Sequence, residues 1–344
     1  MDHRISASRL FGILVGLIAA PAWAESLAQD ASAGSDEEWV HPMTPWGDPD
    51  LRGVWPIDHM IGTPLVRPGE MGDRLFVTDE EFAEREERMI ATTARYDQED
   101  AEDRIGMGHW AEPWQAQRQT SLIIDPPDGQ LPELTEFGAA KSETLGSSWF
   151  RESWDTPEDF DVWDRCITRG MPPSMLAFRY NNGIEIMQAP GYVVIRLEMI
   201  HDTRIIPVDG RPRLDPAIRH WMGEPRGHWE GNTLVVESSN FNGIAGMTNV
   251  ATVGTPWHSI ATSESLHIVE RFTLLNEDVI RFEMTIDDPE IMTAPWTITY
   301  PWQRDQGYEF YEYACHEDNY TIRDYITTSR YERAQSAAQS EPEE

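Results

Sequence analysis

The sequence predicts a mainly β fold, an antiparallel barrel or sandwich that follows an N-terminal helical and irregular layer. After about residue 166, short runs of β-branched and aromatic residues alternate with turn sequences such as APG and DGR, about every 8–15 residues. No helix-like segment separates these runs, so we expect the strands to pair antiparallel. The 14 tryptophans and 11 phenylalanines of the 344-residue chain supply enough bulky apolar volume for a sizeable core.

The first 24 residues predict a secretory signal peptide. A basic start (MDHRISASR) precedes the apolar run LFGILVGLIAAPA, and the small residues Ala22 and Ala24 suit cleavage near Ala24. The apolar run is shorter than the ~20 residues that a membrane-spanning helix needs, and no other stretch reaches that length. The alternative is an uncleaved anchor. We therefore expect a periplasmic or secreted protein with no membrane span.

Residues 25–118 are expected to form the N-terminal irregular and helical layer. Residues 25–50 are polar, and Pro49–Trp55 (PDLRGVW) predicts a turn that leads into a strand. Thr78 and Glu81 have the spacing of a capping box at the start of a helix. The many charges that follow place this helix at the surface.

Residues 119–333 are expected to form the β-barrel-like domain. The predicted strands lie in GIEIMQ, GYVVIRLEMI, TRIIPV, GNTLVVESSNF, SLHIVERFTLL, VIRFEMTID and WTITYPW. Residues 334–344 are polar and acidic, so we expect a disordered acidic tail there.

The charge and the missing motifs exclude several classes of function. With 60 acidic and 27 basic residues, the net charge of −33 would repel nucleic acid and an anionic lipid surface. The sequence lacks a G-x-S-x-G elbow, an H-E-x-x-H motif, a phosphate loop and a G-x-G-x-x-G after a strand. We therefore expect no cofactor, and a small-molecule ligand or substrate as the partner. The oligomeric state is left open.

The chain contains two cysteines, Cys166 and Cys315. In an oxidising compartment an even number of cysteines first predicts a disulfide. A catalytic or metal-binding thiol is the alternative interpretation.

The stretch RGHWEGN predicts polar groups that share one face of a strand. Alternate side chains point the same way, so Arg226, His228 and Glu230 would lie on one face and Trp229 on the other. A histidine oriented by a carboxylate is a candidate general base. The alternative is a polar ladder on a solvated sheet face, with a turn at Gly231.

A second polar group interrupts the apolar stretch EMIHDTRII. His201, Asp202 and Arg204 lie together where a strand should end, and binding groups gather at strand ends. Arg204 is a candidate clamp for a carboxylate or carbonyl oxygen. The alternative is a turn with Asp202 as its hydrogen-bonding corner.

The stretch YEYACHEDNY crowds a cysteine, a histidine and three carboxylates between aromatic residues. As a strand, it would place Glu312 and His316 on one face, ~13 Å apart, and Tyr313 and Cys315 on the other. Glu312 and His316 could then line one pocket without sharing a metal ion. We expect no metal site, and a single divalent metal is the alternative, since zinc normally takes three or four protein ligands.

Longer segments carry a family resemblance over roughly residues 45–330. The segments RGHWEGNTLVVESSNF, ERFTLLNEDVIRFEMTIDDPE and YEYACHEDNY, with the stretch RGMPPSMLAFRYNNGIEIMQAPGYVVIRLEMIHDTRIIPVDGR, together resemble a broad family of uncharacterised secreted bacterial proteins. In addition, Gly53–Trp55 (GVW) is similar to the Gly-x-Trp motif at the start of lipocalin-like barrels, which implies a lipocalin-like fold. The resemblance implies no catalytic residue.

Two function hypotheses follow from these patterns. The first is an extracytoplasmic enzyme, a lyase, isomerase or hydrolase, that acts on a small, partly apolar molecule in an aromatic-lined barrel pocket. Its acid/base residues would be His201, His228 and His316, with Glu230 and Glu312 as orienting carboxylates, and its substrate contacts Arg204, Asp202, Arg226 and Trp229. The second is a non-catalytic lipocalin-like binding protein for an apolar small molecule. A structural envelope protein is a third alternative.

Overall fold

The structure is a computed structural model that describes residues 39–112, 114–148, 151–247 and 259–340. The predicted signal peptide, its cleavage site and the first part of the polar lead-in lie outside the described residues, as do the last four residues of the chain.

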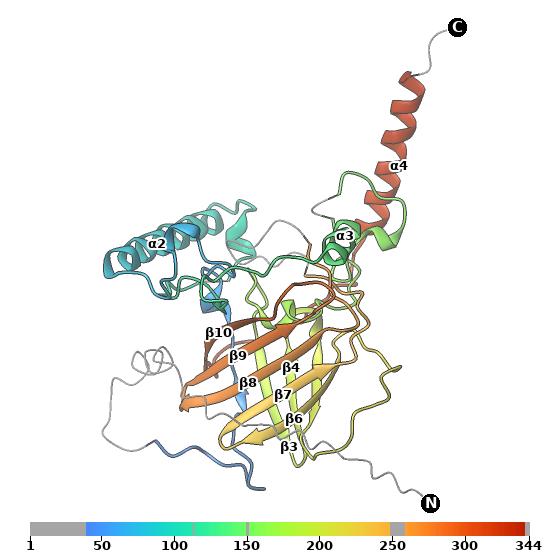
Figure 1. The fold of residues 1–344 in the computed structure, drawn as a ribbon. Coiled ribbons are helices and arrows are strands. Elements are labelled where there is room, and N and C mark those ends of the chain that lie inside the picture. The colour runs from blue at the N-terminus through green and yellow to red at the C-terminus, as the bar shows by residue number, and fades with distance from the viewer. Residues whose placement is uncertain (1–38, 113, 149–150, 248–258, 341–344) are drawn as a thin grey trace, which may run out of the picture. The chain divides into compact units, whose positions relative to one another are not determined.

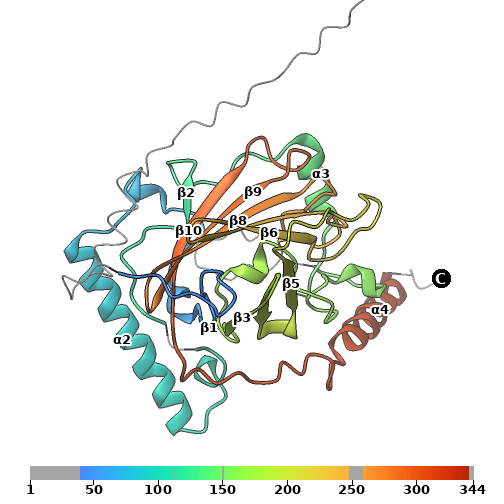
Figure 2. The ribbon, with the colours of Figure 1, turned by 90° about the horizontal axis from the view of Figure 1, so that it is seen from below.

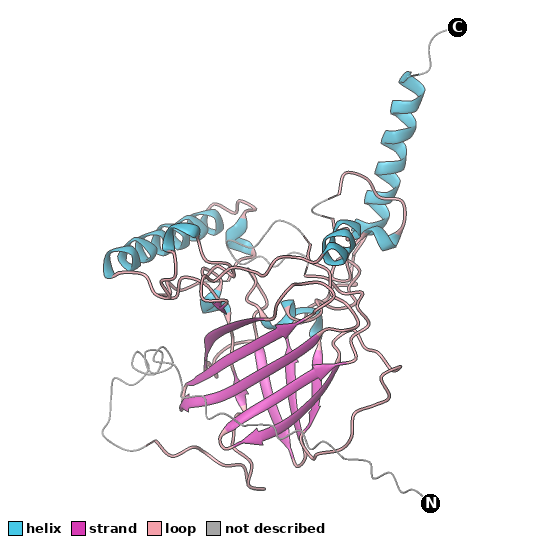
Figure 3. Ribbon diagram, in the orientation of Figure 1, coloured by secondary structure: helices cyan, strands magenta, loops and turns pink. Residues whose placement is uncertain are grey.

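The strands form two antiparallel sheets, which confirms the β-rich, antiparallel prediction (Figures 1 and 3). The four-stranded sheet has the order β1 (Gly53–Val54), β3 (Ile184–Ala189), β4 (Tyr192–Leu197), β5 (Thr203–Pro207). The six-stranded sheet has the order β2 (Ile123–Asp125), β10 (Trp296–Gln303), β9 (Val279–Asp287), β8 (His267–Asn276), β7 (Thr233–Ser239), β6 (Glu224–Glu230). Each predicted apolar run after residue 180 contains one of these strands.

The two sheets face each other across one core (Figure 2). Side chains alternate between buried and partly exposed positions along β8 and β9, as a sheet with one buried face requires. Phe272 and Phe282 are cross-strand partners with ring centroids 5.0 Å apart, and Trp302 packs 4.8 Å from Phe282. These rings are fully buried, so side chains fill the space between the sheets.

The described strands do not close into a barrel, which corrects the barrel alternative of the prediction. No ladder hydrogen bonds join the two sheets in the described residues, although β6 is the strand that follows β5 in the chain. Gly227 of β6 faces Ile206 and Val208, and a Cβ atom there would lie 2.7 Å from a methyl carbon of Val208. Side chains therefore occupy the approach between these two edges, where a barrel would have ladder hydrogen bonds.

Three α-helices occur in the described residues: α2 (Asp79–Ala101), α3 (Glu136–Thr144) and α4 (Thr321–Ser340). The capping box predicted for α2 is present, because the Thr78 hydroxyl accepts from the Glu81 N–H while the Glu81 carboxylate accepts from the Thr78 N–H. Single 3-10 turns connect other parts of the chain: η1 (Asp58–Met60), η2 (Gly69–Met71), η3 (Met107–His109), η4 (Pro157–Asp159), η5 (Pro173–Met175) and η6 (Met199–His201).

Residues 334–340, expected to be disordered, instead continue α4. The segment (AQSAAQS) is rich in Ala and Gln, which favour helix in the absence of packing. The first half of α4 is anchored by Tyr325, whose ring packs edge-on against Trp154 at 4.8 Å. An established helix then extends at little cost, because each added residue gains a backbone hydrogen bond.

Cys166 and Cys315 form the predicted disulfide across 149 residues, with their Cα atoms 5.7 Å apart. It joins the segment before β3 to the segment after β10, and the described residues contain no other disulfide.

We expect Cys166→Ser combined with Cys315→Ser to lower the free energy of unfolding by about 2–5 kcal/mol, because the bond restricts a long loop of the unfolded chain. Urea unfolding of both proteins measures the difference. A thiol assay on denatured, unreduced wild-type protein is the control, and two free thiols would contradict the bond.

His59 is a buried histidine that joins η1 to β10. It is 2 % exposed, and its Nε2 lies 3.0 Å from the Pro301 carbonyl oxygen, to which the neutral ring donates. Burial lowers the pKa of His59 to about 4, since the charged ring would lose its hydration.

We expect His59 to make the protein less stable in mild acid. The unfolded chain binds a proton at this histidine near pH 6.5, and the folded chain only near pH 4. The contribution of neutral His59 to the free energy of unfolding is therefore complete above pH 6.5 and is lost as the pH falls from 6.5 to 4. Between pH 7.5 and 4.5, wild type should lose about 2–3 kcal/mol more than His59→Gln in urea unfolding. Equal losses in the two proteins would refute the assignment.

Candidate functional site

The predicted polar face of β6 exists but lies in solvent. His228 Nε2 is 3.3 Å from Glu230 Oε1, and both side chains are about half exposed. Glu230 also binds Arg271 of β8 at 2.7 Å, which lowers the pKa of its carboxyl group. A turn at Gly231 follows, as predicted. His228, Glu230 and Arg271 thus form a polar ladder on a solvated sheet face, which was the alternative interpretation of this stretch.

The two other residues predicted on this strand have structural contacts. Arg226 binds the carboxylate of Glu224 and donates to the Pro212 carbonyl oxygen at 3.2 Å. Trp229 is partly buried and packs against the core on the other face of β6. Neither side chain borders the aromatic cavity described below.

At the end of β4, His201 and Asp202 lie in the turn that leads to β5. His201 is exposed in η6, and its left-handed backbone (φ 50°) turns it away from the strand. Asp202 accepts a hydrogen bond from the Thr168 hydroxyl at 2.7 Å, and burial raises the pKa of its carboxyl group. The Asp202 side chain therefore connects this turn to the segment that contains Thr168.

Arg204 does clamp a carboxylate, but this carboxylate belongs to Glu270 of the same chain. The guanidinium of Arg204 on β5 binds both oxygens of Glu270 on β8, one of them at 2.7 Å. The side chains are 1 % and 0 % exposed. The predicted ligand clamp is therefore an internal ion pair that joins the two sheets.

The stretch YEYACHEDNY is not the strand that we expected. Residues 311–314 have no regular secondary structure, and residues 315–318 form a turn. The predicted division into two faces is therefore wrong as well. Glu312 lines the same cavity as Tyr313 and Cys315, described in the next paragraph, whereas His316 is exposed and does not line it. The tyrosines of this segment predicted a strand, but none of the described strands pairs with it.

The cavity beside the disulfide has a volume of about 650 Å³. Five separate segments of the chain form it. Its lining residues are His109, Trp110, Ser148, Trp163, Asp164, Tyr180, Asn181, Glu312, Tyr313, Ala314, Cys315, Asn319 and Thr321. Because Trp110, Glu312 and Ala314 are exposed, the cavity opens to solvent. We call it the aromatic cavity.

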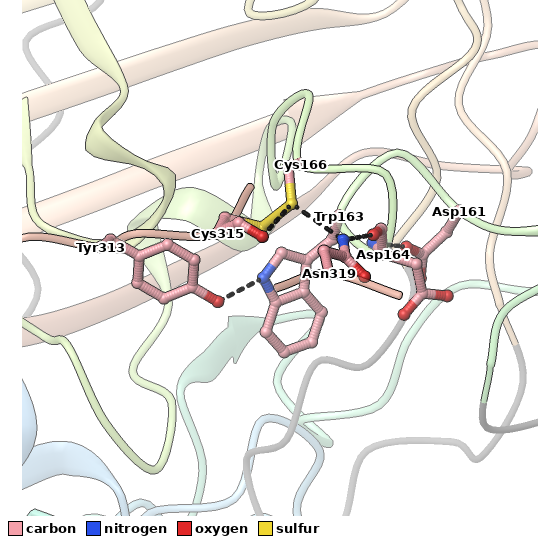
Figure 4. Close-up of a disulfide and its surroundings, with 7 residues drawn as sticks. All are labelled: Asp161, Trp163, Asp164, Cys166, Tyr313, Cys315 and Asn319. Carbon is pink, nitrogen blue, oxygen red and sulfur yellow. Dashed lines mark hydrogen bonds between the residues drawn. A yellow bond between two sulfur atoms is a disulfide. The ribbon is translucent and has the colours of Figure 1, made fainter. Parts of the chain in front are cut away.

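Covalent and polar contacts hold these segments together (Figure 4). Beside the disulfide, the Trp163 indole N–H donates to the Tyr313 hydroxyl at 3.1 Å, and the Asn319 amide donates to the Asp164 carbonyl oxygen at 3.1 Å. The inner wall is therefore fixed before any ligand arrives.

The inner wall combines apolar surface with a buried positive charge. Arg169 lies behind Trp163, with its guanidinium carbon 5.7 Å from the Trp163 ring centroid and 5.0 Å from that of Phe178. Burial lowers the pKa of Arg169 to about 10, so it stays charged at neutral pH. Burial also raises the pKa of Tyr180 to about 12 and raises that of Tyr313, which keeps both phenols protonated.

His109 borders the aromatic cavity, but both of its ring nitrogens face acceptors. Nε2 lies 2.9 Å from the Arg104 carbonyl oxygen, and Nδ1 lies 3.6 Å from the Asp100 carboxylate. Neither nitrogen is left to exchange a proton with a bound molecule, so this histidine is poorly placed for acid/base chemistry.

A second cavity, of about 780 Å³, lies along α2. Charged side chains such as Glu84, Arg88 and Arg95 border it. Arg85 donates to the carbonyl oxygens of Gln117 (2.7 Å) and Gln119 (2.8 Å), so it fixes the helix in place. This charged groove suits a partly apolar molecule less well than the aromatic cavity does.

Membrane-spanning helices and metal clusters are both absent from the described residues. No helix there combines the length and apolar character needed to cross a bilayer. In the same residues, no three side chains of His, Cys, Asp or Glu converge where a metal ion could bind.

Comparison with protein-family models, curated proteins and solved structures finds no match to this chain. The resemblance to secreted bacterial proteins therefore stays a prediction, and function has to be argued from the geometry.

Sequence reasoning missed Trp163, Arg169, Tyr180 and His109. A signal for the first two was available, because they lie three residues before and three residues after Cys166. Once the disulfide is assumed, aromatic and cationic side chains that flank both cysteines become neighbours.

We expect Glu270→Gln to lower the free energy of unfolding by about 3–5 kcal/mol, because Arg204 would remain buried without its counter-charge. Arg204→Met combined with Glu270→Leu should recover most of this loss, since no charge stays buried. Urea unfolding measures both.

The matched control is Glu230→Gln, which breaks the exposed pair with Arg271 on the same sheet and should cost only about 0–1 kcal/mol. Equal effects of Glu270→Gln and Glu230→Gln would contradict the role of the buried pair.

Proposed function

We propose that this protein is an extracytoplasmic binding protein that holds a small, partly apolar molecule in the aromatic cavity. The observation that carries the proposal is the cavity itself: about 650 Å³, bordered by Trp110, Trp163, Tyr180 and Tyr313, with a few polar groups at fixed positions. This volume and this mixture of apolar wall and convergent polar groups are typical of small-molecule sites.

The rigidity of the wall supports binding. A disulfide and direct hydrogen bonds hold Trp163, Tyr313 and Asn319 in place, so little ordering remains to be done when a ligand enters. Aromatic side chains with few rotatable bonds provide contact area at low entropic cost.

A lipocalin-like site between the sheets has less support. Phe272, Phe282 and Trp302 fill that space and are fully buried. The ligand of our proposal lies outside the sheet core, against the segments that the disulfide joins.

Catalysis by the residues predicted from sequence also has less support than binding. His201, His228 and His316 are exposed, lie on different elements and do not border the aromatic cavity. Glu312 does border it, but His109, the only histidine among the described residues that line it, has Nε2 on the Arg104 carbonyl oxygen and Nδ1 facing the Asp100 carboxylate. A lyase, isomerase or hydrolase would need another acid/base pair.

The proposed location rests on the signal-like N-terminus and on the disulfide, which forms and persists in oxidising compartments. The acidic surface keeps such a protein soluble and disfavours nucleic acid as a partner.

Filling the cavity tests the proposal. Ala314 is exposed and borders the cavity, so Ala314→Trp should occupy it without loss of core packing. We expect the neutral fluorescent probe N-phenyl-1-naphthylamine to bind wild type saturably, and Ala314→Trp to weaken binding about tenfold or more, or ~1.4 kcal/mol.

The control is Ala217→Trp, at an equally exposed alanine that does not border this cavity, and it should bind the probe like wild type. Absence of saturable binding to wild type, or equal loss in both variants, would count against the proposal.

A further inference from the structure

Arg169 is a buried cation with unused hydrogen-bonding capacity. The residue is 5 % exposed, and its one direct hydrogen bond goes from Nη1 to the Leu176 carbonyl oxygen at 3.1 Å. Nε and Nη2 have no hydrogen-bond partner among the described residues. Buried N–H groups of a charged side chain are costly when unpaired, so this arrangement calls for an explanation.

The groups that face Arg169 do not provide a paired carboxylate. Trp163 and Phe178 offer their ring faces, while the charge of Arg169 is influenced by the phenols of Tyr313, Tyr180 and Tyr300 and by Asp161. Asp161 is the only carboxylate in that set. The chain has 60 acidic residues, so carboxylates are not scarce.

Arg169 borders a small internal cavity of about 20 Å³, together with Ser174, Asn182 and Glu198. This is room for about one water-sized group. Asn181 lines both this space and the aromatic cavity, so the two adjoin at that residue.

Glu198 also borders the small cavity, and among the described residues that line it this is the carboxylate that could repel an anion. Its Oε1 accepts from the Asn181 amide (3.0 Å) and the Tyr311 N–H (2.9 Å). Its Oε2 accepts from the Gly183 N–H (3.1 Å) and the Tyr308 hydroxyl (2.6 Å). Four donors therefore stabilise its charge, whereas Nε and Nη2 of Arg169 have no partner among the described residues.

We infer that the ligand of the aromatic cavity is a small carboxylate, with its apolar body against Trp163, Tyr180 and Tyr313 and an oxygen directed past Asn181 toward Arg169. This inference rests on the proposed binding function. Recognition of a carboxylate by an arginine whose Nε and Nη2 are both unpartnered is among the strongest polar contacts available to a protein.

The test uses two probes with the same aromatic body: 2-naphthoate, a carboxylate, and the neutral 2-naphthalenemethanol. We expect wild type at physiological salt to bind the acid about ten- to a hundredfold more tightly than the alcohol, by isothermal titration calorimetry. Arg169→Met should abolish this preference, so that the variant binds the acid no more tightly than the alcohol.

Two variants make the result specific. Arg211→Met removes an exposed arginine paired with Asp209, and should keep the full preference although the net charge changes equally. Arg169→Lys keeps the charge and loses the planar fork, so it should weaken acid binding about tenfold and reduce the preference for the acid over the alcohol accordingly. If Arg169→Met does not fold, Arg169→Lys decides the matter.

A second readout separates ligand recognition from a structural role. If Arg169 serves the ligand, Arg169→Met should be at least as stable as wild type without ligand, because an unpaired buried charge is removed. A clear loss of stability in Arg169→Met would indicate a structural role and count against the inference.

The outcomes also separate the two proposals. Equal binding of acid and alcohol by wild type, or unchanged acid binding by Arg169→Lys, would overturn the carboxylate inference and leave the binding function in place. Failure of wild type to bind either naphthalene, together with failure to bind N-phenyl-1-naphthylamine, would overturn both.

Discussion

The ion pair between Arg204 and Glu270 joins the inner faces of the two sheets, and the apolar core packs around it. Either charge alone in this environment would cost several kcal/mol. The sheets can therefore be stable only where the guanidinium of β5 meets the carboxylate of β8. Apolar side chains tolerate small shifts of one sheet over the other, but a two-point ion pair does not. We infer that this pair selects the arrangement of the sheets as much as it stabilises it.

The same core positions the segment that carries the cavity. Met175 places its thioether 3.4 Å from the Arg204 guanidinium, and its carbonyl oxygen accepts a hydrogen bond from Tyr300 of β10. The chain just before Met175 contains Cys166 and Arg169. A disulfide then attaches the late segment with Tyr313 to this fixed base. The wall of the aromatic cavity thus depends on the core for its position, although it lies outside the sheets.

The strands were predictable because each buries one face, so apolar and polar residues alternate along them. The alternation in β8 even places Glu270 between Ile268 and Phe272 on the inward face, which marks it as a buried charge that needs a partner. The partner strand was not predictable, because pairing between distant segments depends on the whole fold. For the same reason Arg204 was taken for a ligand clamp.

The candidate site was harder to predict than the fold. The aromatic cavity draws Trp110, Trp163, Tyr180 and Tyr313 from four segments, none of which has a motif of its own. Only the disulfide, readable from a count of two cysteines, indicated that two of these segments meet. The histidines stood out in the sequence because each lies within two residues of a carboxylate, yet exposure at turns and on a solvated sheet face explains such polar stretches equally well.

The central claim is that a small molecule binds beside the disulfide and that its charged end is recognised by Arg169. A crystal structure of the protein with 2-naphthoate tests this most directly. Our account predicts the naphthalene ring in the aromatic cavity and a carboxylate oxygen within hydrogen-bond distance of Arg169 Nε or Nη2. Naphthoate between the two sheets or along α2, or an aromatic cavity that stays empty of it, would contradict the account.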